Sequence, residues 1–360
     1  MRAGESRATL GGRLFVIGQV FDRRSNALNL WRLILAIEVI LWHSFAVTGH
    51  SVSSPVAQRL LFSLGVDGFF AVSGFLVTAS WLNNPQPRAY LQARALRILP
   101  GFYTCLIVTA FVFAPIGLAL QGGSALGLLR SSGPLKFVLF NSAIAHLKLD
   151  VGGTPQGVPH PRTWNASLWT LVFEVICYLA VLAIGVVGLA RYRWTSSAML
   201  AAGVIVALLL PPMADPWSWT IPQCLARFTI MFAAGAVLYQ LRDVIPARWS
   251  WVAASFAIVA VCGLLLPDYR IIGALPLAYG IIASGIMLHR FHLHNDLSYG
   301  VYIYAWPTQQ LLVIGGLRHF DPLIFAVVAT TATLPFAAAS WFAIEKPALR
   351  LKAAKLPHHV

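Results

Sequence analysis

The chain has 360 residues, of which 58% are hydrophobic and only 11% are charged. A soluble domain carries about 25% charged residues, so this composition excludes a soluble enzyme, a disordered tail and a coiled coil. The net charge of +14 does not point to nucleic acid, because the basic residues fall mostly between apolar stretches, where the positive-inside rule accounts for them. The composition therefore predicts a polytopic membrane protein.

Ten stretches meet the length and apolarity of a membrane-spanning helix, which needs about 20 mostly apolar residues. In chain order they are 29–49, 60–82, 99–120, 168–189, 196–212, 224–241, 249–266, 270–288, 297–316 and 322–343. They predict an all-α membrane bundle of about ten transmembrane helices.

The ends of the chain are expected to be cytoplasmic tails around one transmembrane domain at 29–345. Residues 1–28 are basic and Gly-rich and lack the apolar region of a cleavable signal peptide, and residues 346–360 form the second tail. With the N-terminus inside, most Lys and Arg residues fall on the inner side, which places both termini in the cytoplasm. We expect a multi-pass protein of the cell (inner or plasma) membrane, in contact with its lipids.

The first span holds three ionisable side chains, which are costly in a membrane and by default functional. Arg32 and His43 are eleven residues apart, close to three helical turns, so both project from one face and lie roughly 16 Å apart along the axis. Glu38 points to a different side. A face of Arg32 and His43 directed into the bundle fits one functional site, whereas Arg32 alone could instead reach the cytoplasmic interface. His43 is either a structural histidine or, as a neutral imidazole, a general base.

The next two spans add a carboxylate and a pair of arginines. Asp67 requires a partner within the bundle, whereas Ser73 and the neighbouring glycines favour close helix packing. Arg94 and Arg97 are neighbours on one face at the entry to the third span. Their guanidinium groups suit the binding of phosphates, and equally of lipid headgroups.

A long outer loop follows at 121–167, and it is expected to be either a lid or re-entrant segment over an outer pocket or a plain connector. The fourth span then carries a lone carboxylate, Glu174. It is placed to meet His43 and fix the tautomer of the imidazole, or to form a structural hydrogen bond between helices.

The ninth span is polar for a membrane helix. Tyr302, Trp306 and Gln309 share one face, which suits a sugar-like ligand, although an interfacial aromatic belt explains the aromatic residues as simply. No metal site is predicted, because the four cysteines lie singly in apolar runs and the cluster of His289, His292 and His294 lacks a suitably spaced carboxylate.

Together these motifs resemble the acyltransferase 3 family of membrane O-acyltransferases, from about residue 28 to 350. The similar features are the Arg32–His43 spacing, Asp67-Gly68-Phe69-Phe70 with Ser73-Gly74-Phe75, Arg94-x-x-Arg97, Ser167-Leu168-Trp169 followed by Glu174, Leu297-Ser298-Tyr299-Gly300-Val301-Tyr302, and Glu345-Lys346-Pro347. Each feature is weak alone, and their order along the chain is the specific signal.

The resemblance implies transfer of an acyl group, usually acetyl, from acyl-CoA to a hydroxyl of a carbohydrate, glycan or glycolipid. It implies that His43 is the catalytic histidine and that Arg32, Arg94 and Arg97 hold the donor. His43 would either deprotonate the acceptor hydroxyl or carry the acyl group itself. Ala305 stands where many members have a histidine, so no role is implied there.

A carrier of a lipid-linked glycan, transporter or flippase-like, is the alternative function. It would use the same charges within the membrane as a substrate path. The sequence shows no inverted repeat, which disfavours this alternative. The acceptor, the acyl chain, the role of Glu38 and the oligomeric state are not predicted.

Overall fold

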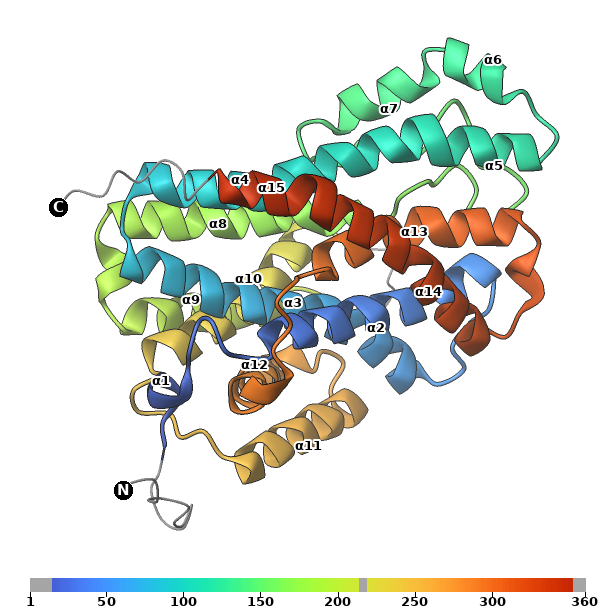
Figure 1. Cartoon of the computed structure of the whole chain (residues 1–360). Coiled ribbons are helices and arrows are strands. Elements are labelled where there is room, and N and C mark those ends of the chain that lie inside the picture. The colour runs from blue at the N-terminus through green and yellow to red at the C-terminus, as the bar shows by residue number, and fades with distance from the viewer. Residues whose placement is uncertain (1–14, 214–218, 352–360) are drawn as a thin grey trace, which may run out of the picture.

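The computed structural model describes residues 15–213 and 219–351, and these residues form helices and two isolated bridges but no β-strand. The prediction of an all-α fold is therefore confirmed. The described elements include seven helical segments long and apolar enough to cross a membrane (Figure 1), which are Leu28–Thr48, Pro55–Asn83, Pro87–Leu120, Ser167–Val186, Ile221–Gln240, Arg270–Met287 and Pro322–Arg350.

Every predicted span coincides with a helix of the structure. The helices are α2 (Leu28–Thr48), α3 (Pro55–Asn83), α4 (Pro87–Val108) continuing into α5 (Ala114–Leu120), α8 (Leu171–Val186), α9 (Trp194–Leu209), α10 (Ile221–Gln240), α11 (Trp249–Leu265), α12 (Arg270–Met287), α13 (Ser298–Ile314) and α14 (Pro322–Ser340). Because α9, α11 and α13 are shorter than 18 residues, the count of ten crossings stays a prediction, as does the orientation of the termini.

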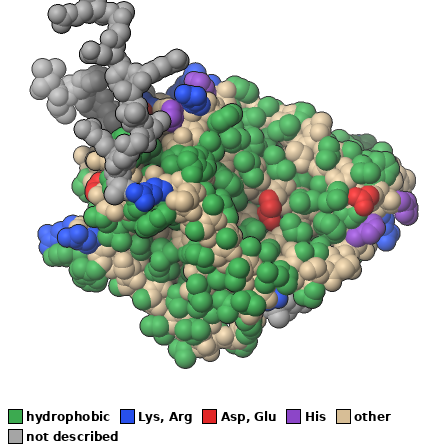
Figure 2. Space-filling view, turned by 90° about the horizontal axis from the view of Figure 1, so that it is seen from below, with side chains coloured by type: hydrophobic (Ala, Val, Ile, Leu, Met, Phe, Trp, Pro, Cys, Tyr) green, Lys and Arg blue, Asp and Glu red, His purple; other side chains and the backbone are tan. Residues whose placement is uncertain are grey.

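The outer surface of the bundle is apolar, as expected for a multi-pass membrane protein. Figure 2 shows the face on the side of α11 and α12 (below in Figure 1), where hydrophobic side chains dominate. On α11, large side chains such as Trp249, Leu264 and Leu265 are more than half exposed. A soluble monomer rarely exposes so continuous an apolar surface, which is what lipid tails would cover.

Part of the predicted N-terminal tail belongs to the bundle. Ile17, in α1 (Ile17–Val20), is fully buried, and its N–H donates to the carbonyl oxygen of Ile245 at 2.9 Å. The last predicted tail begins as a helical turn, α15 (Lys346–Arg350), that prolongs α14. Residues 1–14 and 352–360, which make up the rest of the two predicted tails, lie outside the described residues.

The centre of the bundle depends on a close crossing of α3 and α10. A Cβ atom on Gly74 would lie 1.9 Å from the carbonyl oxygen of Phe232, and one on Gly235 would lie 1.9 Å from that of Ala71. Small residues allow two backbones to approach in this way, which agrees with the packing role predicted for the second span.

Asp67 has the partners that a carboxylate inside a membrane bundle requires. Its side chain is fully buried and accepts hydrogen bonds from Nε of Arg227 at 2.7 Å, Nε of Arg270 at 2.6 Å and the hydroxyl of Tyr269 at 2.6 Å. Arg270 also donates to the hydroxyl of Ser63 at 2.6 Å. This cluster ties α3 to α10 and α12.

Replacing Asp67 with asparagine is expected to lower the unfolding free energy by about 3–5 kcal/mol, the cost of removing one partner of a buried ion pair. The buried guanidinium of Arg227 would lose its counter-charge, and that of Arg270 would keep only Asp268. The measurement is thermal unfolding in detergent. Asp243→Asn is the control, because Asp243 pairs with Arg242 at the surface, where an ion pair contributes about 0–1 kcal/mol. Equal shifts of the two variants would contradict the expectation.

The long loop at 121–167 is folded onto α13 (Ser298–Ile314). It contains two short helices, α6 (Ala125–Arg130) and α7 (Gly133–Asn141), which lie beside α5 in Figure 1. Trp164 is fully buried, and Asn165 donates to the carbonyl oxygen of Ile303 at 2.8 Å. Gln310 donates to the carbonyl oxygens of His160 and Thr163. These hydrogen bonds hold the loop against α13.

Candidate active site

The predicted donor arginines converge at one end of the bundle, together with a carboxylate that the sequence reasoning missed. Oδ2 of Asp296, just before α13, accepts hydrogen bonds from Nη1 of Arg32 on α2 and, at 2.7 Å, from Nη2 of Arg97 on α4. Oε2 of Glu345 lies 3.9 Å from Nη1 of Arg97. Asp296 therefore fixes the two arginines relative to one another.

Asp296 stays ionised in this setting. Burial opposes its charged form, but the positive charges of Arg32 and Arg97 outweigh burial, and the pKa of the carboxyl lies below its usual value. Ser298 donates to Oδ1 from its backbone N–H at 3.2 Å and from its hydroxyl at 2.5 Å. The available sequence signal was a lone aspartate directly before the ninth span.

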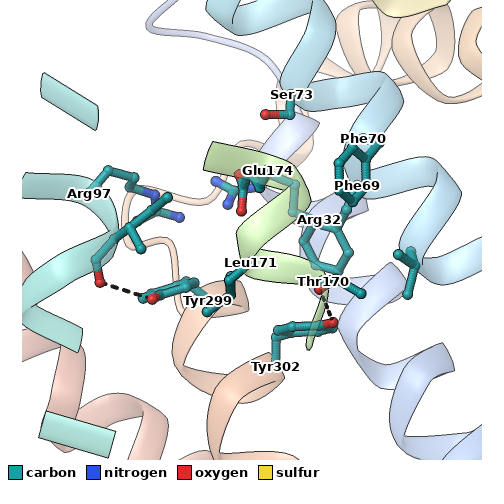
Figure 3. A pocket seen from close by; sticks show the side chains of 12 residues that line it. Arg32, Phe69, Phe70, Ser73, Arg97, Thr170, Leu171, Glu174, Tyr299 and Tyr302 are labelled. Carbon is teal, nitrogen blue, oxygen red and sulfur yellow. Dashed lines mark hydrogen bonds between the residues drawn. The ribbon is translucent and has the colours of Figure 1, made fainter. Parts of the chain in front are cut away.

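A cleft opens between α2, α3, α4 and α8 beside these arginines, and we call it the arginine cleft. It comprises two adjoining cavities that share Arg32, Phe69, Ser73, Arg97 and Glu174, and the larger has a volume of about 230 Å³. Figure 3 shows Arg32, Arg97 and Glu174 directed into the same space. The larger cavity is also lined by Arg94.

Arg94 is the least engaged of the three arginines. Its guanidinium lies 5.9 Å from the ring centroid of Tyr90 and 5.5 Å from that of Tyr178. No described residue bonds its buried Nε atom. The side chain thus keeps hydrogen-bonding capacity for an anionic ligand in the cleft.

The predicted meeting of Glu174 with His43 is wrong. Glu174 lines the arginine cleft and accepts a hydrogen bond from the hydroxyl of Tyr178, one helical turn further along α8. His43 instead contacts α13, where the centroids of its ring and the Trp306 ring are 4.8 Å apart and the rings nearly perpendicular. The carboxylate of Glu174 is hydrogen-bonded to a residue four positions along its own helix, and not to a residue of a neighbouring helix.

His43 and Arg32 occupy one side of α2, as their spacing predicts. Arg32 bonds the residue that leads into α13, and His43 packs against α13 itself. His43 is 9% exposed, and no partner for its Nδ1 atom occurs in the part of the chain that the structure describes. Glu38 faces another way, toward Gly65 of α3. A continuous α13-facing side of α2 therefore carries both groups.

Of the predicted sugar-binding face on α13, only Tyr302 lines the arginine cleft. Trp306 is fully buried and donates to the carbonyl oxygen of Thr163 at 3.0 Å. Gln309 is also fully buried and donates to the carbonyl oxygen of Ile40 and the hydroxyl of Ser44, both at 3.0 Å. Trp306 and Gln309 therefore pack α13 against its neighbours and do not face a ligand cavity. Polar side chains on a membrane helix often form such hydrogen bonds between helices.

These features define a membrane-embedded helical bundle with a basic cleft at one end and a buried histidine further along the same helix face. The chain matches the model of the acyltransferase domain, the acyltransferase 3 family, over residues 25–342. It belongs to this family, and it is an acyltransferase. The membership favours the transferase over the carrier of a lipid-linked glycan.

Two curated proteins are similar to nearly the whole chain. An O-acetyl transferase of Shigella phage Sf6 is 25% identical, covering 92% of this chain and 98% of that protein. Nodulation protein 10 of Rhizobium leguminosarum bv. viciae is 27% identical, covering 91% of this chain and 94% of that protein. No solved structure matches.

Proposed function

We propose that this acyltransferase moves an acyl group, in the first instance acetyl, from acyl-CoA to a hydroxyl of a carbohydrate or glycan. The observation that carries the proposal is the convergence of Arg32, Arg94 and Arg97 on one cleft. Guanidinium groups bind phosphate oxygens through paired, charge-assisted hydrogen bonds, and coenzyme A carries several phosphates. The similar O-acetyl transferase supports acetyl as the group and oxygen as its destination.

His43 is proposed as the catalytic histidine. In the direct route its neutral imidazole takes the proton of the acceptor hydroxyl, the oxygen attacks the thioester carbonyl, and the carbon–sulfur bond breaks to release the thiolate of CoA. The thiolate is then protonated. In the covalent route an imidazole nitrogen attacks the thioester carbonyl and the carbon–sulfur bond breaks to release the thiolate of CoA. The acceptor hydroxyl then attacks the acyl-imidazolium, and its proton passes through the freed imidazole to the thiolate.

The distance between cleft and histidine suits this donor. Arg32 and His43 are separated by roughly 16 Å along α2, and in acyl-CoA a long pantetheine arm separates the phosphates from the thioester. A donor held by its phosphates in the arginine cleft would therefore extend its reactive end toward His43.

The test uses the purified full-length protein in lipid nanodiscs with radiolabelled acetyl-CoA and a deacetylated cell-envelope glycan fraction. We expect label to move to the glycan in a form that mild alkali releases, as an ester and not an amide. Label that resists alkali would contradict O-acylation. A wild-type protein that neither binds nor consumes acetyl-CoA or longer acyl-CoAs would contradict the donor.

A further inference from the structure

The outer loop places a second imidazole close to His43. The ring centroid of His160 lies 5.3 Å from that of Trp306, at a steep interplanar angle. The same indole contacts His43 at 4.8 Å. Both histidines therefore pack against one tryptophan, His43 from α2 and His160 from the loop.

The position of His160 is fixed by the backbone around it. Its carbonyl oxygen accepts a hydrogen bond from Nε2 of Gln310 at 2.9 Å, and Nε2 also donates to the carbonyl oxygen of Thr163 at 2.8 Å. Burial holds the pKa of the His160 imidazole below its usual value, so the ring is neutral near neutral pH. The ring is also hydrogen-bonded to the backbone of Ala46, and in a neutral imidazole that donates from one nitrogen the other nitrogen is an acceptor.

A cavity of about 300 Å³ lies beside His160, at the opposite end of α2 from the arginine cleft. Its wall includes Trp42, Phe45, His50, Gln58 and His160. His43 is not part of this wall, so His160 is the side chain that both faces the cavity and packs against the tryptophan that His43 contacts.

The lining has the chemistry of a sugar site. Trp42 and Phe45 offer aromatic surfaces for the C–H groups of a pyranose ring, and Gln58, His50 and His160 offer donors and acceptors for its hydroxyls. The volume is at the small end for ligand pockets, which run from about 300 to 1,000 Å³. That size suits one sugar residue with the rest of the glycan outside.

We propose that this cavity is the acceptor site and that His160 binds the acceptor hydroxyl and directs it toward His43. The proposal rests on the function proposed above and adds the place and chemistry of the acceptor. It replaces the buried Trp306 and Gln309 as sugar-binding residues, and it gives the long outer loop a direct part in substrate recognition.

The test compares His160→Ala, His160→Gln and Trp42→Leu with the wild type in nanodiscs, using the glycan fraction that the wild type acetylates. We expect the KM for the acceptor to rise about tenfold in His160→Ala, the value of one lost hydrogen bond near 1.4 kcal/mol. His160→Gln keeps a donor and an acceptor and should recover part of the loss. Trp42→Leu should raise the same KM.

The control is Arg162→Gln, an exposed residue of the same loop that is outside the cavity wall. It should leave every constant unchanged. In all variants the binding of acetyl-CoA, measured by calorimetry, should match the wild type, because the arginine cleft is untouched. His160→Gln should also keep the wild-type thermal stability, whereas Trp42→Leu shrinks a buried side chain packed on Phe62 and is expected to lower it.

Two results would overturn the acceptor site. One is an unchanged acceptor KM in both His160→Ala and Trp42→Leu while the wild type transfers acetyl groups. The other is a parallel loss of acetyl-CoA binding and stability, which would show a structural role. A wild type that consumes no acyl-CoA is a different result, because it contradicts the proposed function itself.

Discussion

Replacing His43 with alanine is expected to lower kcat about 10²- to 10⁴-fold, the usual contribution of a general base, with little change in the KM for acetyl-CoA. The donor phosphates are proposed to bind at the arginine cleft, roughly 16 Å away along α2. The variant should therefore bind acetyl-CoA normally but lose the acyl-transfer step. The measurement is release of free CoA together with transfer of label to glycan.

Two further variants separate the loss of the imidazole from the loss of packing and from a general effect of replacing a histidine. His43→Gln fills nearly the same space against Trp306 and should lose as much activity as the alanine variant. His319→Gln, at an exposed histidine between α13 and α14, should behave as wild type. A His43 variant with near wild-type kcat would remove the histidine from the mechanism. Label bound to the wild-type protein without acceptor, and absent in His43→Gln, would favour the covalent route.

Replacing Arg94 with glutamine is expected to raise the KM for acetyl-CoA about 10- to 100-fold, which corresponds to a lost hydrogen bond to a charged group of about 1.5–3 kcal/mol. Arg94 lines the cleft without an ion-pair partner among the described residues. Its loss therefore leaves no buried carboxylate unpaired. Steady-state kinetics and calorimetry with acetyl-CoA measure the effect, and kcat should change little.

Arg88→Gln is the matched control for the donor cleft. Arg88 is exposed on the same helix α4, and it does not line the cleft. If both variants weaken acetyl-CoA binding equally, the arginines act through the general surface charge or the lipid headgroups. A selective effect of Arg94→Gln would instead favour direct contact with the donor.

The arrangement of spans was readable because apolar runs of about 20 residues have few other uses in a protein. The structure of residues 121–167 did not follow from hydropathy. There the packing of Trp164 and the helices α6 and α7 depend on contacts with distant parts of the chain. Hydropathy carries no information on such contacts.

The candidate site was predicted only in part, because spacing identifies residues on one helix but not contacts between distant parts of the chain. Spacing along one helix identified the side shared by Arg32 and His43, because helical periodicity is local. The hydrogen bond between Arg32 and Asp296 joins residues 264 positions apart in the sequence, and nothing in local spacing indicates such a pair. Glu174 was assigned to His43, but its partner in the structure is Tyr178, four residues further along its own helix.

Helix α2 contains neither proline nor glycine between Leu28 and Thr48. Such a helix is a stiff rod with a fixed rise of about 1.5 Å per residue, and it acts as a spacer between the arginine cleft and His43. Donor selection would then depend on length: a thioester carried on a shorter arm would not reach the imidazole while its phosphates stay in the cleft. The protein would accordingly distinguish acyl donors by the reach of their carrier before it distinguishes them by the acyl group.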